Sequence, residues 1–97
     1  MATYIGLYRW TEKGVSTAKD APTRIEAAKK AAQALGGSVK GVYITMGQYD
    51  LVSIGEFPND EAAAKFALSL GIQGNVSTQT LRAFTEEEFR KIVASLP

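Results

Sequence analysis

Hydrophobic and polar residues alternate along four stretches of the chain, and this period of two predicts β-strands. The expected strands span residues 3–10, 38–46, 49–57 and 74–84. Between and after them, apolar residues recur every three or four positions, which predicts helices. The expected helices span residues 21–37, 58–71 and 85–96. Residues 11–20 are polar and contain a glycine, so we expect a loop there with one helical turn near its end.

The order of these elements is β-α-β-β-α-β, followed by a helix at the C-terminus. This order is the split βαβ, or ferredoxin-like, arrangement: an α+β fold with a four-stranded antiparallel sheet. With 97 residues, the chain has the size of one domain, 1–97. A chain of this length buries only a modest core, so association with another subunit would help its stability.

The segment 46–50, Met-Gly-Gln-Tyr-Asp, lies between the two middle strands. Gly47 and Gln48 permit a two-residue reversal, because glycine can adopt the positive φ that such a turn requires. The carboxylate of Asp50 follows the turn, where it can accept backbone N–H bonds or contact a ligand. We favour the first role for Asp50, that of a structural brace.

Residue parity along the strands predicts two unlike faces of the sheet. One face is aliphatic, and we expect it to pack on the helices as the core. This aliphatic face comprises Ile5, Leu7, Val42, Ile44, Val52, Ile54, Leu81 and Ala83. The other, mixed face carries all four tyrosines, the single tryptophan and several hydroxyl side chains. It comprises Tyr4, Gly6, Tyr8, Trp10, Tyr43, Thr45, Tyr49, Leu51, Ser53, Thr78, Thr80 and Arg82.

The mixed face is too aromatic to be exposed and too hydroxylated to be a plain core, so we expect it to meet another surface. The simplest partner is a second copy of the chain, which would close two sheets into a barrel-like homodimer. The interior of that barrel has the profile of a small-molecule pocket, but the same face would also serve as a dimer interface without a ligand. The residues expected to bind a ligand are Tyr8, Trp10, Tyr43, Tyr49 and Arg82.

Three of these candidate ligand-binding residues, Tyr49, Trp10 and Arg82, can each be interpreted in two ways. The hydroxyl of Tyr49 could bond a ligand or the partner subunit, and Trp10 could be a plug at the dimer seam or a stacking wall. Arg82 needs a partner or water, since an unpaired buried charge costs about 3–5 kcal/mol. An acid across the interface is the favoured partner, and a ligand carboxylate or phosphate is the alternative.

Composition narrows the chemistry further. The chain has no cysteine and no histidine, which excludes thiol nucleophiles, zinc fingers and His-based acid–base catalysis. We therefore assign no catalytic residues, no metal and no cofactor, and a small acidic or aromatic molecule is the expected ligand. The net charge of +1 gives no argument for nucleic acid, and no segment has the length and hydrophobicity of a signal peptide or membrane span. The expected location is cytoplasmic.

Four segments in order, 8–14, 41–52, 58–68 and 78–89, resemble the GYD domain family. The family is named for a Gly-x-Tyr-Asp turn, here Gly47, Tyr49 and Asp50. The resemblance implies a small dimeric α+β barrel protein, common in bacteria, whose biochemical function is unsettled.

The turn also resembles one in the ligand-binding domains of the leucine-responsive regulator family, which bind amino acids near subunit interfaces. That resemblance implies a stand-alone binding or sensing module. Cofactor-free monooxygenases share the barrel, so a cofactor-independent monooxygenase or isomerase is the alternative, with Tyr49, Trp10 and Asp50 in its pocket. Shared architecture does not by itself imply shared function.

Overall fold

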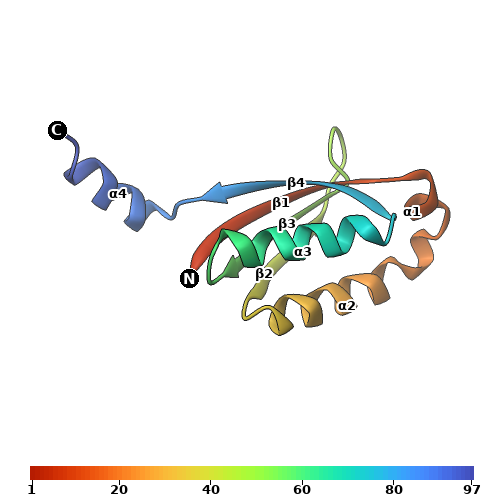
Figure 1. Ribbon diagram of the computed structural model, residues 1–97. Coiled ribbons are helices and arrows are strands. Elements are labelled where there is room, and N and C mark those ends of the chain that lie inside the picture. The colour runs from red at the N-terminus through yellow and green to blue at the C-terminus, as the bar shows by residue number, and fades with distance from the viewer.

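The computed structural model describes residues 1–97 as a four-stranded sheet with two long helices, α2 and α3, on one side (Figure 1). The strands are β1 (Ala2–Trp10), β2 (Ser38–Ile44), β3 (Leu51–Phe57) and β4 (Val76–Ala83). The helices are α1 (Glu12–Ser16), α2 (Ala21–Ala34), α3 (Asp60–Ile72) and α4 (Glu86–Ala94), and a 3₁₀ turn spans Ala18–Asp20. This order confirms the predicted ferredoxin-like α+β fold. The 3₁₀ turn at Ala18–Asp20 confirms the helical turn expected near the end of the 11–20 segment, and the short helix α1 before it was not expected.

The strand order in the sheet is β2-β3-β1-β4, and every neighbouring pair is antiparallel. Strand β1 is therefore central. Gly6 lies opposite Ser53 of β3 on one side and Thr80 of β4 on the other. Tyr8 lies opposite Leu51. Since directly opposite residues share a face, this register places these side chains on the same side of the sheet.

The core lies between that side of the sheet and helices α2 and α3. The ring of Phe57 contacts the rings of Tyr4 and Phe66, with centroids 5.9 and 5.2 Å apart. The helices contribute small residues at the contact, which lets the aromatic rings of the sheet fill the space between the layers. The buried cluster comprises Tyr4, Ala32, Phe57, Ala62, Ala63 and Phe66.

The prediction that the aliphatic face packs on the helices is wrong for β1, β3 and β4, because their mixed face does so. Tyr4 and Tyr8 are 6% and 9% exposed, whereas Ile54 and Leu81 are 37% and 41% exposed. The buried tyrosines remain satisfied, because the hydroxyl of Tyr4 donates to Asp60 and that of Tyr8 shares a hydrogen bond with Ser53. Alanine-rich helices and paired hydroxyls thus make the aromatic side of the sheet the buried one.

Strand β2 departs from the predicted parity as well. A bulge between Val39 and Gly41 shifts its register, so Val39 and Val42 both face the helices. Tyr43 pairs with Val52 and lies on the opposite side, 60% exposed. The side without helices, here called the open face, carries Ile5, Leu7, Tyr43, Val52, Ile54 and Leu81.

Helix α4 projects from the end of β4 away from the other helices (Figure 1). It begins with the predicted capping box, in which Thr85 and Glu88 bond each other's backbone N–H groups. The bond from the Thr85 N–H holds the pKa of the Glu88 carboxyl below its ordinary value. The apolar stripe of α4, formed by Phe89, Ile92, Val93 and Leu96, is exposed throughout. The chain therefore presents two uncovered apolar surfaces, this stripe and the open face.

The connection between β2 and β3 is longer than the predicted two-residue turn. β2 ends at Ile44 and β3 begins at Leu51, which leaves a six-residue loop. The loop is closed by a hydrogen bond from the Thr45 N–H to the Asp50 carbonyl at 2.9 Å. Gly47 has φ +109°, which confirms the predicted positive φ at this position.

Replacing Gly47 with alanine should lower the free energy of unfolding by about 1–2 kcal/mol, because a Cβ is disfavoured at positive φ. The space around Gly47 is empty, so the cost is purely conformational. Gly71 in α3 also has empty space but no positive φ. The Gly71→Ala variant should therefore gain about 0.5–1 kcal/mol. Urea unfolding of both variants checks the pair, and equal effects would contradict the assignment.

Candidate functional site

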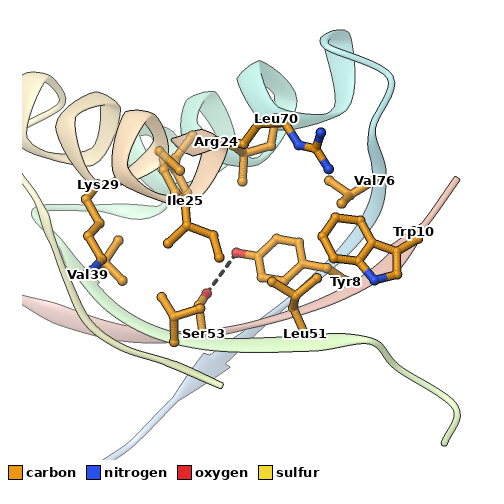
Figure 2. A pocket seen from close by; sticks show the side chains of 13 residues that line it. Tyr8, Trp10, Arg24, Ile25, Lys29, Val39, Leu51, Ser53, Leu70 and Val76 are labelled. Carbon is orange, nitrogen blue, oxygen red and sulfur yellow. Dashed lines mark hydrogen bonds between the residues drawn. The ribbon is translucent and has the colours of Figure 1, made fainter. Parts of the chain in front are cut away.

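A cavity of about 80 Å³ lies between the sheet and helices α2 and α3 (Figure 2). Its walls are almost entirely apolar. The strands contribute Tyr8, Trp10, Val39, Val42, Leu51, Ser53 and Val76, and the helices contribute Arg24, Ile25, Ala28, Lys29, Phe66 and Leu70. The cavity adjoins the buried aromatic cluster, because Phe66 of α3 belongs to both. Concave apolar sites with few polar groups are typical of small-molecule binding.

The lining residues include two uncharged hydroxyls, which form a hydrogen-bonded pair. The Tyr8 hydroxyl and Ser53 Oγ are 2.8 Å apart (Figure 2). Burial raises the pKa of Tyr8, and the bond to Ser53 opposes this only in part, so the phenol is neutral at pH 7. A Cβ at Gly6 would lie 2.2 Å from the Tyr8 hydroxyl, so this pair requires glycine at position 6.

Trp10 is fixed by contacts to both its backbone and its ring. Its backbone N–H donates to Asp50 Oδ2 at 2.8 Å, so the Asp50 carboxylate braces the end of β1 as favoured from the sequence. The Arg24 guanidinium lies 5.5 Å from the centre of the indole ring. Arg24 also donates to the carbonyls of Gly14 and Thr17, at 3.1 and 3.0 Å. Helix α1, α2 and the β2–β3 loop together hold this aromatic wall in place.

The turn that braces Trp10 has the sequence Gly47-x-Tyr49-Asp50, and the model of the GYD domain matches residues 4–93. The chain belongs to the GYD domain family. Among solved structures, it is similar to TTHA0845 from Thermus thermophilus, with 28% sequence identity and a TM-score of 0.52. That match covers 88% of this chain and 95% of the other. No curated protein matches the chain.

Of the five predicted site residues, this GYD domain brings only Tyr8 and Trp10 together in the cavity. Tyr43 lies on the open face. Tyr49 lies beside Leu7 on the helix-free side, where its hydroxyl donates to Gln79 at 2.6 Å and its ring lies 5.1 Å from the Arg9 guanidinium. The family's tyrosine is therefore separated by the sheet from the cavity that its aspartate supports.

Arg82 lies at the other end of the sheet. Its guanidinium is 5.6 Å from the ring centre of Tyr4 and 4.6 Å from that of Phe84. It donates to the backbone carbonyls of Thr3 and Ala83, and it forms no ion pair within the chain. The expected acid partner across a subunit interface stays a prediction.

The residues of α2 and α3 that line the cavity were not predicted from the sequence. Ile25 and Ala28 belong to the apolar stripe of the predicted first helix, which marks them as buried but not as cavity walls. The same helical pattern places Arg24 and Lys29 on a solvated face. Which strand residues face them depends on the packing of α2 on the sheet, and no local pattern encodes that.

Two further kinds of site find no support in the GYD domain. No three His, Cys, Asp or Glu side chains gather where they could hold a metal ion. None of the helices combines the length and apolar character needed to cross a bilayer.

The two buried tyrosines predict a loss of stability at alkaline pH. Burial raises the pKa of Tyr4 above 10.0, with a further contribution from the Asp60 carboxylate, and burial also raises that of Tyr8. Since both pKa values are higher in the folded than in the unfolded chain, this stability is complete below pH 10 and decreases as the pH rises beyond it. Melting temperatures measured on both sides of pH 10 should fall less steeply in Tyr8→Phe than in the parent. Parallel curves would contradict the prediction.

Proposed function

We propose that this GYD domain protein is a small-molecule-binding module that works as a homodimer. The observation that carries the binding function is the apolar cavity between the sheet and helices α2 and α3, whose lining residues include one neutral hydroxyl pair, Tyr8 and Ser53. Such a site can orient a ligand through one hydrogen-bonding group while the rest of the ligand fills apolar space. The chain has no histidine or cysteine nearby to favour a catalytic function over binding.

The location of the proposed site differs from the barrel interior expected from the sequence. Of the aromatic residues that suggested a ligand wall, Tyr8 and Trp10 line the cavity beneath α2 and α3, so the ligand would lie within one subunit. The open face carries an aliphatic cluster with polar residues such as Thr3, Glu56 and Gln79 around it, which resembles the apolar centre and polar rim of a contact between subunits.

Two uncovered surfaces support the homodimer. The open face has no helix on it, and α4 has a fully exposed apolar stripe. Helix α4 has nine residues, and an isolated helix shorter than about 12–15 residues is marginal in water. A second copy with its open face against the first would bury both faces and offer α4 a surface to pack on.

The binding function can be tested with the protein's own fluorescence, because the single tryptophan, Trp10, lines the cavity. A panel of small metabolites is screened by tryptophan emission and by thermal shift. Ligands of the cavity should change both signals in the parent and should lose affinity in Ala28→Leu, which fills the cavity from α2.

The matched control is Ala27→Leu, since Ala27 is the exposed neighbour on the same helix and does not line the cavity. It should bind like the parent. The proposal fails if no compound in the panel binds, or if Ala28→Leu binds as tightly as Ala27→Leu does.

A further inference from the structure

We infer that the ligand of the cavity is a neutral single-ring aromatic molecule with one hydroxyl or carbonyl group. That group bonds to the Tyr8–Ser53 pair, and the ring lies among Trp10 and the aliphatic walls. This inference rests on the proposed binding function and chooses between the acidic and aromatic ligands that the sequence left open. Four observations lead to it, namely the size of the cavity, its hydroxyl pair, the positions of its two cations and its aromatic wall.

The volume limits the ligand to one small ring. A cavity of about 80 Å³ is several times the volume of about 10–15 Å³ that one water molecule requires. It is about half of an engineered cavity of about 150 Å³ that binds benzene, so even one small ring requires partly exposed lining side chains such as Lys29 to move outward. A fused-ring or long-chain ligand would need the helices to move apart.

The hydroxyl pair determines the type of polar group. Each hydroxyl has one proton to donate and lone pairs to accept with, and the bond between Tyr8 and Ser53 uses only one of the two protons. The second proton and the remaining lone pairs have no other partner within the chain, so a ligand group that reaches the pair can bond to them. A hydroxyl can use both, and a carbonyl can accept the proton. Because the rest of the wall is apolar, the cavity offers hydrogen-bond partners to only one polar group of a ligand.

The two cations beside the cavity are already occupied, which argues against an acid. The guanidinium of Arg24 donates to two backbone carbonyls and to Thr17 Oγ1 while lying over Trp10. The amine of Lys29 pairs with Glu26 at 3.3 Å, and its side chain is 43% exposed. A carboxylate in this apolar space would thus lose its hydration without gaining a free positive partner.

The aromatic wall favours a flat ligand. Trp10 and Tyr8 come from β1, and Ile25 and Leu70 come from α2 and α3, so the two sides of the cavity offer rings and branched aliphatic groups (Figure 2). A ring between them gains stacking or edge contacts in addition to area burial. A polar metabolite of the same size would lose its hydration against the apolar lining, so we expect it to bind more weakly than the ring does.

The test compares three probes of nearly the same shape: phenol, benzene and benzoate. Binding to the intact protein is measured by Trp10 fluorescence and by calorimetry. We expect phenol to bind most tightly, benzene more weakly and benzoate least. Ser53→Ala and Tyr8→Phe should each weaken phenol about threefold to tenfold, the range for one lost hydrogen bond, and leave benzene nearly unchanged.

Ser77→Ala is the matched control, because Ser77 is an exposed serine on β4 that does not line the cavity. It should leave the affinity for phenol unchanged. Benzoate binding more tightly than phenol, or phenol binding that is indifferent to both hydroxyl deletions, would overturn the ligand class. Binding of other compounds of the panel, without binding of phenol, would also overturn the ligand class. None of these three results contradicts the proposed binding function. Equal binding by Ala28→Leu and the parent would remove both proposals together.

Discussion

Truncating Phe57 to alanine is expected to lower the free energy of unfolding by about 3–5 kcal/mol. Phe57 is 3% exposed, and its ring joins Tyr4 of β1 to Phe66 of α3. Its removal would take away the contact between the central strand and the second long helix and leave a void. Since a domain of this size is stable by about 5–15 kcal/mol, the loss is a large part of the total.

Leu68→Ala on the outer side of α3 is the control, because Leu68 is 66% exposed. It should change the stability by about 0.5 kcal/mol or less. Urea unfolding followed by circular dichroism measures both variants. A loss below about 1 kcal/mol for Phe57→Ala would show that the face with the aromatic rings is not the core.

Replacing Leu81 with aspartate on the open face should convert a dimer into a monomer. If two open faces meet, the new carboxylate lies in an apolar contact with no cation beside it, which costs about 3–5 kcal/mol. That cost corresponds to a dissociation constant raised at least about a hundredfold. Sedimentation should give twice the chain mass of 10.4 kDa for the parent and the single mass for the variant.

Leu68→Asp introduces the same charge on α3, away from the open face, and should remain dimeric. Phe89→Asp introduces it on the apolar stripe of α4 and should weaken the dimer if the partner covers that helix. A parent that sediments as a monomer, or a Leu81→Asp variant that stays dimeric, contradicts the proposed interface. Neither outcome affects the cavity, which lies on the other side of the sheet.

The element order was predictable because it depends on short-range rules. Alternation and helical spacing identify the strands and long helices. The predicted starts of two helices, at residues 58 and 85, lie within two residues of the observed starts at Asp60 and Glu86. Asn59 caps α3 through Ala62, and Thr85 caps α4 through Glu88. Gly47 marks the β2–β3 loop because only its own φ is involved. The loop length was mispredicted, since the bonds among Thr45, Tyr49 and Asp50 lie within a longer connection.

The buried face of the sheet was not predictable from strand parity. Parity separates two sets of side chains, but it does not say which set meets the helices. A signal was present in the helices, where small residues such as Ala32, Ala62 and Ala63 require large partners across the core. The rings of Tyr4 and Tyr8 meet that requirement, and hydrogen bonds satisfy their hydroxyls, so these two residues, which the sequence assigned to an interface, are internal.

By itself, the sequence determined the family, the order of the elements and the positive φ at Gly47, because each depends on residues that are neighbours along the chain. The brace at Asp50 needed the tertiary structure as well, since its partner, the Trp10 N–H, lies 40 residues away on another strand. The tertiary structure alone decided that Tyr8 and Trp10 of β1 meet Arg24 and Ile25 of α2 around a cavity, and that Tyr43, Tyr49 and Arg82 do not. That outcome follows from a β-bulge, a hydroxyl pair and the spacing between a helix and a sheet. These contacts join residues that are far apart in the sequence, and they form only when the whole chain has folded.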